Sequence, residues 1–228
     1  MQQKIQSSLP ELIWDFPLRV FHWLLVIGFI AMVITANMDS SYFQYHILLG
    51  QCLLALMLFR LVWGFVGGTY ARFRNFVFGP KAIKNYLRGH SETDYSRSGG
   101  HNPLGSLSVW LMLALLSLQV VTGLFATDDI SHAGPLNFLV YGNIESTLTE
   151  LHHLNFLLLI IVIAMHVAAV FYYKIFKQQD LIATMWHGWK PENAALNFSF
   201  ALALRGLVVL FLTAAITFVT LWFIQALE

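Results

Sequence analysis

The sequence predicts an all-α integral membrane protein. Of its 228 residues, 57% are hydrophobic and only 11% are charged, and the mean hydropathy is +0.65. A soluble domain carries about a quarter charged residues, so this composition excludes soluble enzymes, secreted disulfide scaffolds and nucleic-acid-binding modules. Charge-free windows of about 20 residues recur along the chain, which is the length of helix that crosses roughly 30 Å of hydrocarbon. The windows are apolar throughout rather than alternating with a period of two, so they do not predict β-barrel strands.

Five windows fit this description, and each predicts one membrane-spanning helix. The first follows Arg19 and is about 19 residues long, which is too long for the apolar part of a usual signal peptide. Asn37-Met38-Asp39 is also a poor cleavage site, so we expect this segment to be retained. The expected spans are 18–37, 44–67, 104–126, 151–174 and 204–226.

The loops predict the orientation of the chain. The 68–103 connection carries six basic residues against two acidic ones, whereas the 127–150 connection carries four acidic residues and no basic one. Basic loops of membrane proteins stay on the cytoplasmic side. We therefore expect a multi-pass membrane protein with a cytoplasmic N-terminus and a C-terminus on the outer side.

Histidines in the predicted spans are the candidate functional residues, because ionisable side chains inside a membrane are costly and usually functional. His22 begins the first span on the cytoplasmic side, and His46 begins the second on the outer side. His152 begins the fourth span near the outer face, and His166 lies about 21 Å deeper at 1.5 Å per residue. The depths therefore pair His46 with His152 at an outer level and His22 with His166 at an inner level.

The helical periodicity of the fourth span separates two adjacent histidines. At roughly 100° per residue, His166 returns to within about 40° of His152 but lies about 140° from His153. His152 and His166 can thus face the same bundle interior, whereas His153 receives a secondary role or none.

Two pairs of facing imidazoles predict two non-covalent haems b with bis-histidine ligation. An iron with both axial positions filled transfers electrons rather than activating oxygen. Cys52 is the one cysteine of the chain, so covalent attachment through CxxCH is excluded. Gly50 lies one turn after His46 and would leave room for the macrocycle, while Arg19 and Arg60 could pair with the propionates of the inner haem. Four further glycines could also make room or could simply pack helices closely: Gly28, Gly64, Gly67 and Gly123.

Two other functions compete with this interpretation. A histidine-lined transition-metal transporter would suit imidazole chemistry, but none of the five spans has an internal Asp or Glu. A membrane anchor with a mainly structural haem is the other alternative. Neither alternative explains why two histidine pairs should lie at different depths. Electron transfer across the membrane requires this arrangement.

Short motifs resemble the bacterial cytochrome b561 and nickel–iron hydrogenase b-type cytochrome family. The opening WDFPLRVFHW at 14–23 is similar to the family's WDxPxRxxHW, and YHILLG at 45–50 to its HxxxG. The remaining likenesses are RLVWGF at 60–65 followed by ARF at 71–73, GHNPLG at 100–105, the spacing of His152 and His166, and the segment 186–190 after the fourth span.

The resemblance covers about 14–190 and implies a four-helix transmembrane bundle that holds two haems b. The implied ligands are the four histidines of the two predicted pairs. It further implies a bacterial inner-membrane protein with a periplasmic C-terminus. Its expected function is electron transfer in a respiratory chain between the quinone pool and a partner such as a hydrogenase, a c-type cytochrome or, in one branch, superoxide. On this basis we divide the chain into a dihaem domain, 1–190, and an extra C-terminal helix, 191–228.

The sequence departs from the family pattern at two places. A fifth span follows the four of the family core, and it could contact another subunit. His153 stands where some relatives carry Glu, so it is a candidate for proton transfer beside the outer level. The other candidates for handling a quinone proton are His101, His132 and Asp15.

Overall fold

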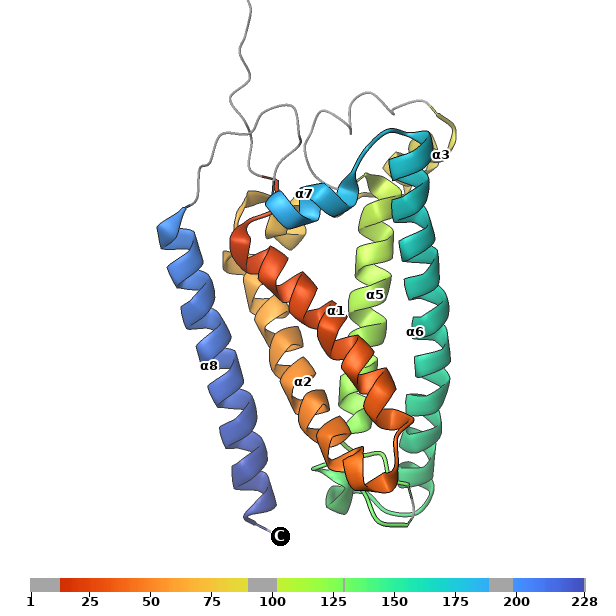
Figure 1. Ribbon diagram of the computed structural model, residues 1–228, viewed down its shortest axis with the longest axis vertical. Helices are drawn as coiled ribbons and strands as arrows, with labels where there is room; N and C mark the ends of the chain where they lie inside the picture. The colour runs from red at the N-terminus through yellow and green to blue at the C-terminus, as the bar shows by residue number, and fades with distance from the viewer. Residues whose placement is uncertain (1–12, 90–101, 129, 189–198, 228) are drawn as a thin grey trace, which may run out of the picture.

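The computed structural model describes residues 13–89, 102–128, 130–188 and 199–227 of the chain. Within them, five helices are long and apolar enough to cross a membrane, as predicted. They are α1 (Phe16–Ala36), α2 (Phe43–Val66), α5 (Pro103–Gly123), α6 (Asn143–Phe176) and α8 (Phe200–Gln225). The chain is therefore a multi-pass helical membrane protein, and Figure 1 shows the five helices running up and down the long axis.

Local sequence explains where the helices begin. Asp15 caps α1 by accepting a hydrogen bond from the Leu18 amide at 2.8 Å. Asn102 caps α5 in the same way, with the Gly105 amide at 2.7 Å. In both helices a proline occupies the first turn, where its missing N–H costs nothing. Pro103 thus begins α5 one residue before the predicted span 104–126.

Helix α6 differs most from its predicted bounds, because it begins eight residues before 151. A charge-free window marks only the part of a helix that lies in hydrocarbon, and Glu145 and Glu150 ended the window at that point. A helix continues into water where its backbone hydrogen bonds are satisfied. At 34 residues, α6 is about 51 Å long and extends well beyond a 30 Å core.

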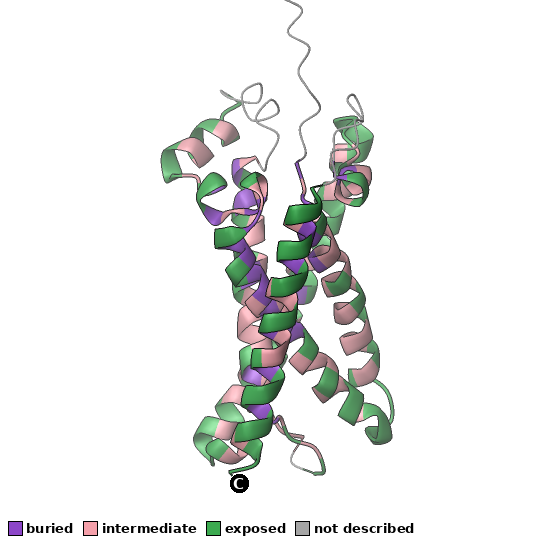
Figure 2. Ribbon diagram, turned by 90° about the vertical axis from the view of Figure 1, so that its left-hand side faces the viewer, coloured by how far each residue is buried: buried purple, intermediate pink, exposed green. Residues whose placement is uncertain are grey.

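Helix α2 is the centre of the bundle. It packs against α1, α5 and α8, while α5 packs against α6. Its inner face is closed by Trp63, which is fully buried, and by Arg60, which is 3% exposed. Buried residues follow the faces between helices, and the outward faces are exposed, as expected where lipid replaces water (Figure 2).

Two short helices lie at the end where α1, α5 and α8 begin: α3 (Pro80–Leu87) and α7 (Leu181–His187). The sequence analysis did not predict them, because helices of about two turns leave little periodic signal. The amides of Ile13 and Trp14 donate to the Gly188 carbonyl, so α7 is fixed to the start of α1.

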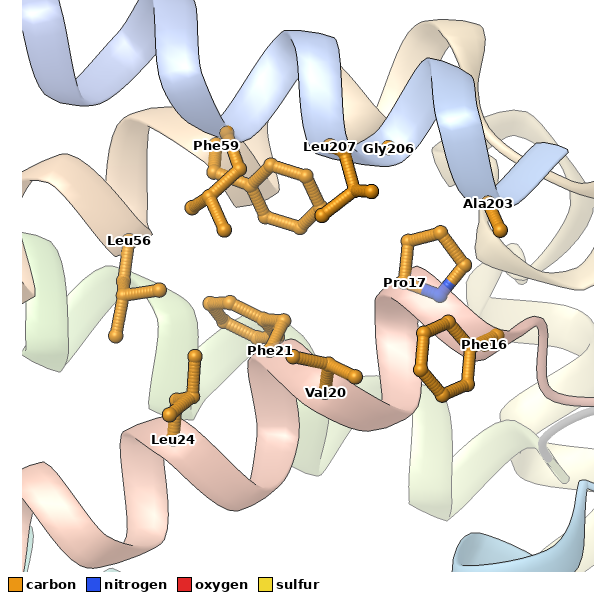
Figure 3. Close-up of a pocket in the computed structure, with 11 residues that line it drawn as sticks. Phe16, Pro17, Val20, Phe21, Leu24, Leu56, Phe59, Ala203, Gly206 and Leu207 are labelled. Atoms are coloured by element: carbon orange, nitrogen blue, oxygen red, sulfur yellow. The ribbon is translucent and has the colours of Figure 1, made fainter. Parts of the chain in front are cut away.

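Helix α8 packs directly on α1 and α2. A Cβ atom at Gly206 would lie 2.3 Å from Pro17 Cγ, so only glycine permits this approach. Beyond this contact an apolar groove of about 330 Å³ lies between α1, α2 and α8, with Val20, Phe21 and Phe59 among its lining residues (Figure 3). The boundary drawn at 190/191 falls outside the described residues, so the division into two domains remains a prediction.

Candidate haem-binding site

The structure brings the four predicted histidines together as two pairs. The imidazoles of His22 and His166 lie close enough to interact electrostatically. Those of His46 and His152 do the same at the other end of the bundle. Each pair joins two helices, α1 with α6 and α2 with α6. The same two pairs were predicted from depth, and their role as haem ligands stays a prediction.

At the outer level both histidines are oriented by neighbouring helices. His46 Nδ1 lies 3.1 Å from the Met32 carbonyl oxygen of α1, and His152 Nδ1 lies 3.1 Å from the Gln119 carbonyl oxygen of α5. A carbonyl oxygen can only accept, so both Nδ1 atoms must carry the hydrogen. The Nε2 lone pair of each ring is then free to bind a metal, as is usual for a ligating histidine.

The side chain of Gln119 contacts the ring of His152. Its amide nitrogen lies 3.1 Å from His152 Nε2 and 3.3 Å from His152 Nδ1. The Gln119 oxygen accepts from Asn155 Nδ2 at 2.6 Å, which fixes the orientation of the amide. Gly123 packs against the same ring, since a Cβ atom there would lie 2.8 Å from His152 Cε1.

Ring contacts connect His46 to the outer loop. Phe43 stacks on His46 with ring centroids 5.2 Å apart, and His132 lies 5.1 Å from Phe43 on the other side. His132 Nδ1 is 3.3 Å from an Asp128 carboxylate oxygen. Backbone N–H donors of Ile130, Ser131 and His132 hold the pKa of Asp128 below its usual range. His132 therefore belongs to a well-ordered turn beside the outer level.

At the inner level the polar atoms are buried but unpaired. Within the described part of the chain, His22 Nδ1, Arg19 Nε and Arg60 Nη1 are buried with no hydrogen-bond partner. The Arg60 guanidinium lies 4.6 Å from the Phe73 ring centroid, a cation–π geometry. Arg19 Nη1 donates to the Trp186 carbonyl of α7, a contact that sequence reasoning missed.

The glycines serve different purposes. A Cβ atom at Gly64 would lie 2.1 Å from the Phe73 ring, and one at Gly28 would lie 2.8 Å from Leu53. At Gly67 the nearest neighbour would be the Trp63 carbonyl at 2.5 Å. These three permit close packing of the chain on itself. Gly50 is different, because its nearest contact would be Met32 Cε at an ordinary 3.7 Å.

Asp15 has a structural position. Its two carboxylate oxygens accept from the Leu18 amide, the Trp63 indole at 3.1 Å and the Gly68 amide at 3.0 Å. Burial raises the pKa of Asp15, and these hydrogen bonds and Arg60 offset part of that increase. The Asp15 carboxylate thus links the start of α1 to the end of α2. Each of these hydrogen bonds is made to a group of the protein itself, so the carboxylate has a structural role.

The remaining candidates for proton transfer are less enclosed. His153 is exposed, and its ring meets that of His152 edge-on at 6.1 Å. Its secondary role beside the outer level stays a prediction. His101 lies outside the described residues. No group of three or more metal-ligating side chains occurs within the described ranges.

Comparison with known proteins decides the family. A sequence profile described as prokaryotic cytochrome b561 matches residues 13–188. The chain belongs to this family. It is therefore a b-type cytochrome of electron transfer, and its cofactor is haem b.

Curated relatives carry names that agree with this assignment. The chain is 22% identical over 209 residues to a probable Ni/Fe-hydrogenase B-type cytochrome subunit of Rhizobium leguminosarum bv. viciae, covering 77% of this chain and 87% of the relative. It is 24% identical to that of Azotobacter vinelandii, with 83% and 92% covered. The probable Ni/Fe-hydrogenase 1 B-type cytochrome subunit of Escherichia coli (strain K12) is 22% identical, with 85% and 96% covered. No solved structure gives a significant match.

Proposed function

We propose that this cytochrome holds two haems b and moves electrons across the membrane between a quinone and a second redox protein. His46 and His152 would bind the outer haem, and His22 and His166 the inner one. The observation that carries the proposal is the occurrence of two histidine pairs at opposite ends of one bundle, one pair with both Nδ1 atoms committed to carbonyl oxygens. When bound, each haem supplies a one-electron Fe(III)/Fe(II) couple.

The residues around each pair fit the group they would hold. At the outer level, the amide of Gln119 would release His152 Nε2 to the iron and keep its hydrogen bond to Asn155. Gly50 lies one turn from His46, and a Cβ atom there would meet only Met32 Cε at an ordinary 3.7 Å, which suits a flat macrocycle against this face. At the inner level, Arg19 and Arg60 have buried donors without partners, and propionates would supply the acceptors.

The direction of insertion and the partner follow from charge and likeness. The 68–103 connection is basic, and the 127–150 connection has no basic residue, which supports a cytoplasmic N-terminus and a periplasmic outer level. The names of the curated relatives support a nickel–iron hydrogenase as the second redox protein. A quinone takes up two electrons and two protons on reduction to the quinol, so two electrons must pass through the chain for each quinone converted.

Haem content tests the proposal directly. The purified protein should bind two haems per chain and give sharp low-spin b-type bands in the dithionite-reduced minus oxidised spectrum. Quinone-linked electron transfer should disappear in His22→Ala and in His166→Ala. A single haem per chain, or turnover that persists without the inner haem, would refute the proposal.

A further inference from the structure

Two buried donors of α1 lie side by side without a partner. Trp23 Nε1 and Arg19 Nε make no hydrogen bond within the described residues, although both atoms are buried. Leaving a buried N–H unpaired costs about 1–3 kcal/mol, so such atoms usually face a bound acceptor. The chain does pair a buried indole elsewhere, since Trp63 Nε1 donates to Asp15.

The two side chains share one face of the helix. Residues four apart in an α-helix are neighbours on its surface, so Arg19 and Trp23 lie one turn apart on the same side. Both contact the same residue of α7. The Trp186 ring meets Trp23 at 5.5 Å and 71°, and its carbonyl accepts from Arg19 Nη1.

Helix α7 covers this side of α1, and its position is fixed at both ends. Gly188 accepts from the amides of Ile13 and Trp14 at 3.0 and 3.2 Å. At its start, Asp180 accepts from the Ala183 amide and pairs with Lys174 of α6 at 2.9 Å. Helix α7, which covers the two donors, is therefore fixed by contacts with the start of α1 and with α6.

The two donors lie next to the inner histidine pair. The Trp23 ring packs edge-on against His22 with centroids 5.2 Å apart. A group bound between Arg19 and Trp23 would thus contact the residues that enclose the inner redox site.

We propose that Trp23 Nε1 and Arg19 Nε form a two-donor site for an acceptor oxygen of a redox ligand, closed by Trp186. The oxygen belongs to a propionate of the inner haem or to a quinone carbonyl, because both present only acceptors and the site presents only donors. The inference rests on the function proposed above. It adds Trp23 as a binding residue and Trp186 as the residue that positions Arg19.

Replacing the indole by a ring of similar shape tests the site. Trp23→Phe removes the N–H and keeps an aromatic ring against His22 and Trp186. The matched control is Trp222→Phe, since Trp222 is 69% exposed on α8. Arg19→Lys is the second variant, because it keeps the charge and removes Nε–H. Redox titration of both haems and the KM for a soluble quinol analogue are measured on each haem-loaded protein.

The two sources of the oxygen give different results. A propionate predicts that Trp23→Phe shifts the potential of one haem and leaves KM unchanged; loss of a hydrogen bond worth about fivefold corresponds to roughly 40 mV at 59 mV per tenfold. A quinone carbonyl predicts about a fivefold rise in KM with both potentials unchanged. Arg19→Lys must move the same quantity, and Trp222→Phe neither.

An indole nitrogen spectrum provides a readout that does not depend on turnover. In reduced, ¹⁵N-tryptophan-labelled protein, Trp23→Phe identifies the Trp23 resonance, and Trp63 serves as an indole with a known acceptor. We expect the Trp23 N–H to be hydrogen-bonded in the haem-loaded protein, or to become so when the quinol analogue is added. A Trp23 N–H free in both conditions, or variants that change neither potential nor KM, would overturn the site. The two-haem spectrum of each variant tests the proposed function separately.

Discussion

The outer and inner histidine pairs differ in the hydrogen-bond partners of their ring nitrogens and of the donors around them. At the outer level, carbonyl oxygens of Met32 and Gln119 already hold the two Nδ1 atoms. At the inner level, His22 Nδ1 is buried without a partner in the described chain, as are donors of Arg19 and Trp23. The outer pair is thus oriented by the protein, whereas a bound group would have to supply the acceptors that the inner donors lack. The two levels are separated by about 21 Å along α6.

Loss of a ligand should have the largest effect and should be confined to one level. His152→Ala and His166→Ala are each expected to reduce the haem content from about two per chain to one, because an iron with one axial histidine is held weakly. Absorbance and redox titration will show which potential disappears, and the two variants should lose different ones. His153→Ala is the matched control and should keep both haems. Loss of the same potential in both variants would contradict the assignment to separate levels.

Asp15→Asn should destabilise the inner end of the fold. The asparagine amide has one acceptor oxygen where the carboxylate has two. Its NH2 group would face an N–H donor, either that of Gly68 or that of the Trp63 indole, and one hydrogen bond would be lost. We expect a loss of about 2 kcal/mol in the free energy of unfolding. Asp39→Asn at the other end of α1 is the control, since Asp39 is exposed and accepts no side-chain cap bond. Thermal unfolding in detergent measures both, and equal midpoints for the two variants would exclude the structural role of Asp15.

The variant Gly50→Ala tests whether a haem packs against this face of α2, because the added methyl group would contact the haem and would not clash with the protein. The protein leaves room for it, because Met32 Cε is flexible and would lie at 3.7 Å. A macrocycle against this face would not leave room, so Gly50→Ala should shift the spectrum of one haem and leave the helical content unchanged. Gly123→Ala is the comparison, with a larger expected effect, because its methyl group would displace the His152 ring itself. An unchanged spectrum in Gly50→Ala would place the outer haem away from Gly50.

The smallest effect is the dependence on pH, which should have opposite signs at the two ends. The pKa of Asp128 is lowered by three backbone N–H donors, so the outer turn is stable above the ordinary pKa of 3.8 and opens as the pH falls through the lowered value. Burial raises the pKa of Asp15 in the folded protein. Protonated Asp15 therefore adds to the free energy of unfolding at low pH, and this stabilisation is lost as the pH rises through the raised pKa. Amide exchange of Ile130 to His132 at pH 5 and pH 4 should remain slow. Fast exchange at pH 4 would mean that the carboxylate does not hold the turn.

The sequence predicted the elements that the bilayer dictates. Spans of about twenty apolar residues and the depths of four histidines follow from helix geometry alone. The five spans are confirmed, and the structure places His22 near His166 and His46 near His152. Contacts between distant segments could not be predicted in this way. The carbonyl partners of His46 and His152 come from other helices, and a carbonyl leaves no trace in the residue type. The Arg19–Trp186 contact was missed for the same reason, although a tryptophan near basic residues after the fourth span was a signal.

Arg60 shows where sequence reasoning was only partly informative. Its position deep in a span indicated a special role, and its burial agrees. The aromatic rings that surround it, Phe73 and Phe76, come from the segment after α2, which returns to cover the helix end. Its role toward a propionate remains a prediction.

Helix α6 sets the distance between the two histidine levels. One unbroken helix carries both His152 and His166, so their separation is fixed by backbone hydrogen bonds and does not change with the thickness of the bilayer. Inserting one residue between them would turn one histidine by about 100° relative to the other and remove it from its partner. Inserting seven would return it to nearly the same face but displace it by about 10.5 Å along the bundle, away from its partner on α1 or α2. One continuous helix thus sets both the direction and the depth of the two histidines.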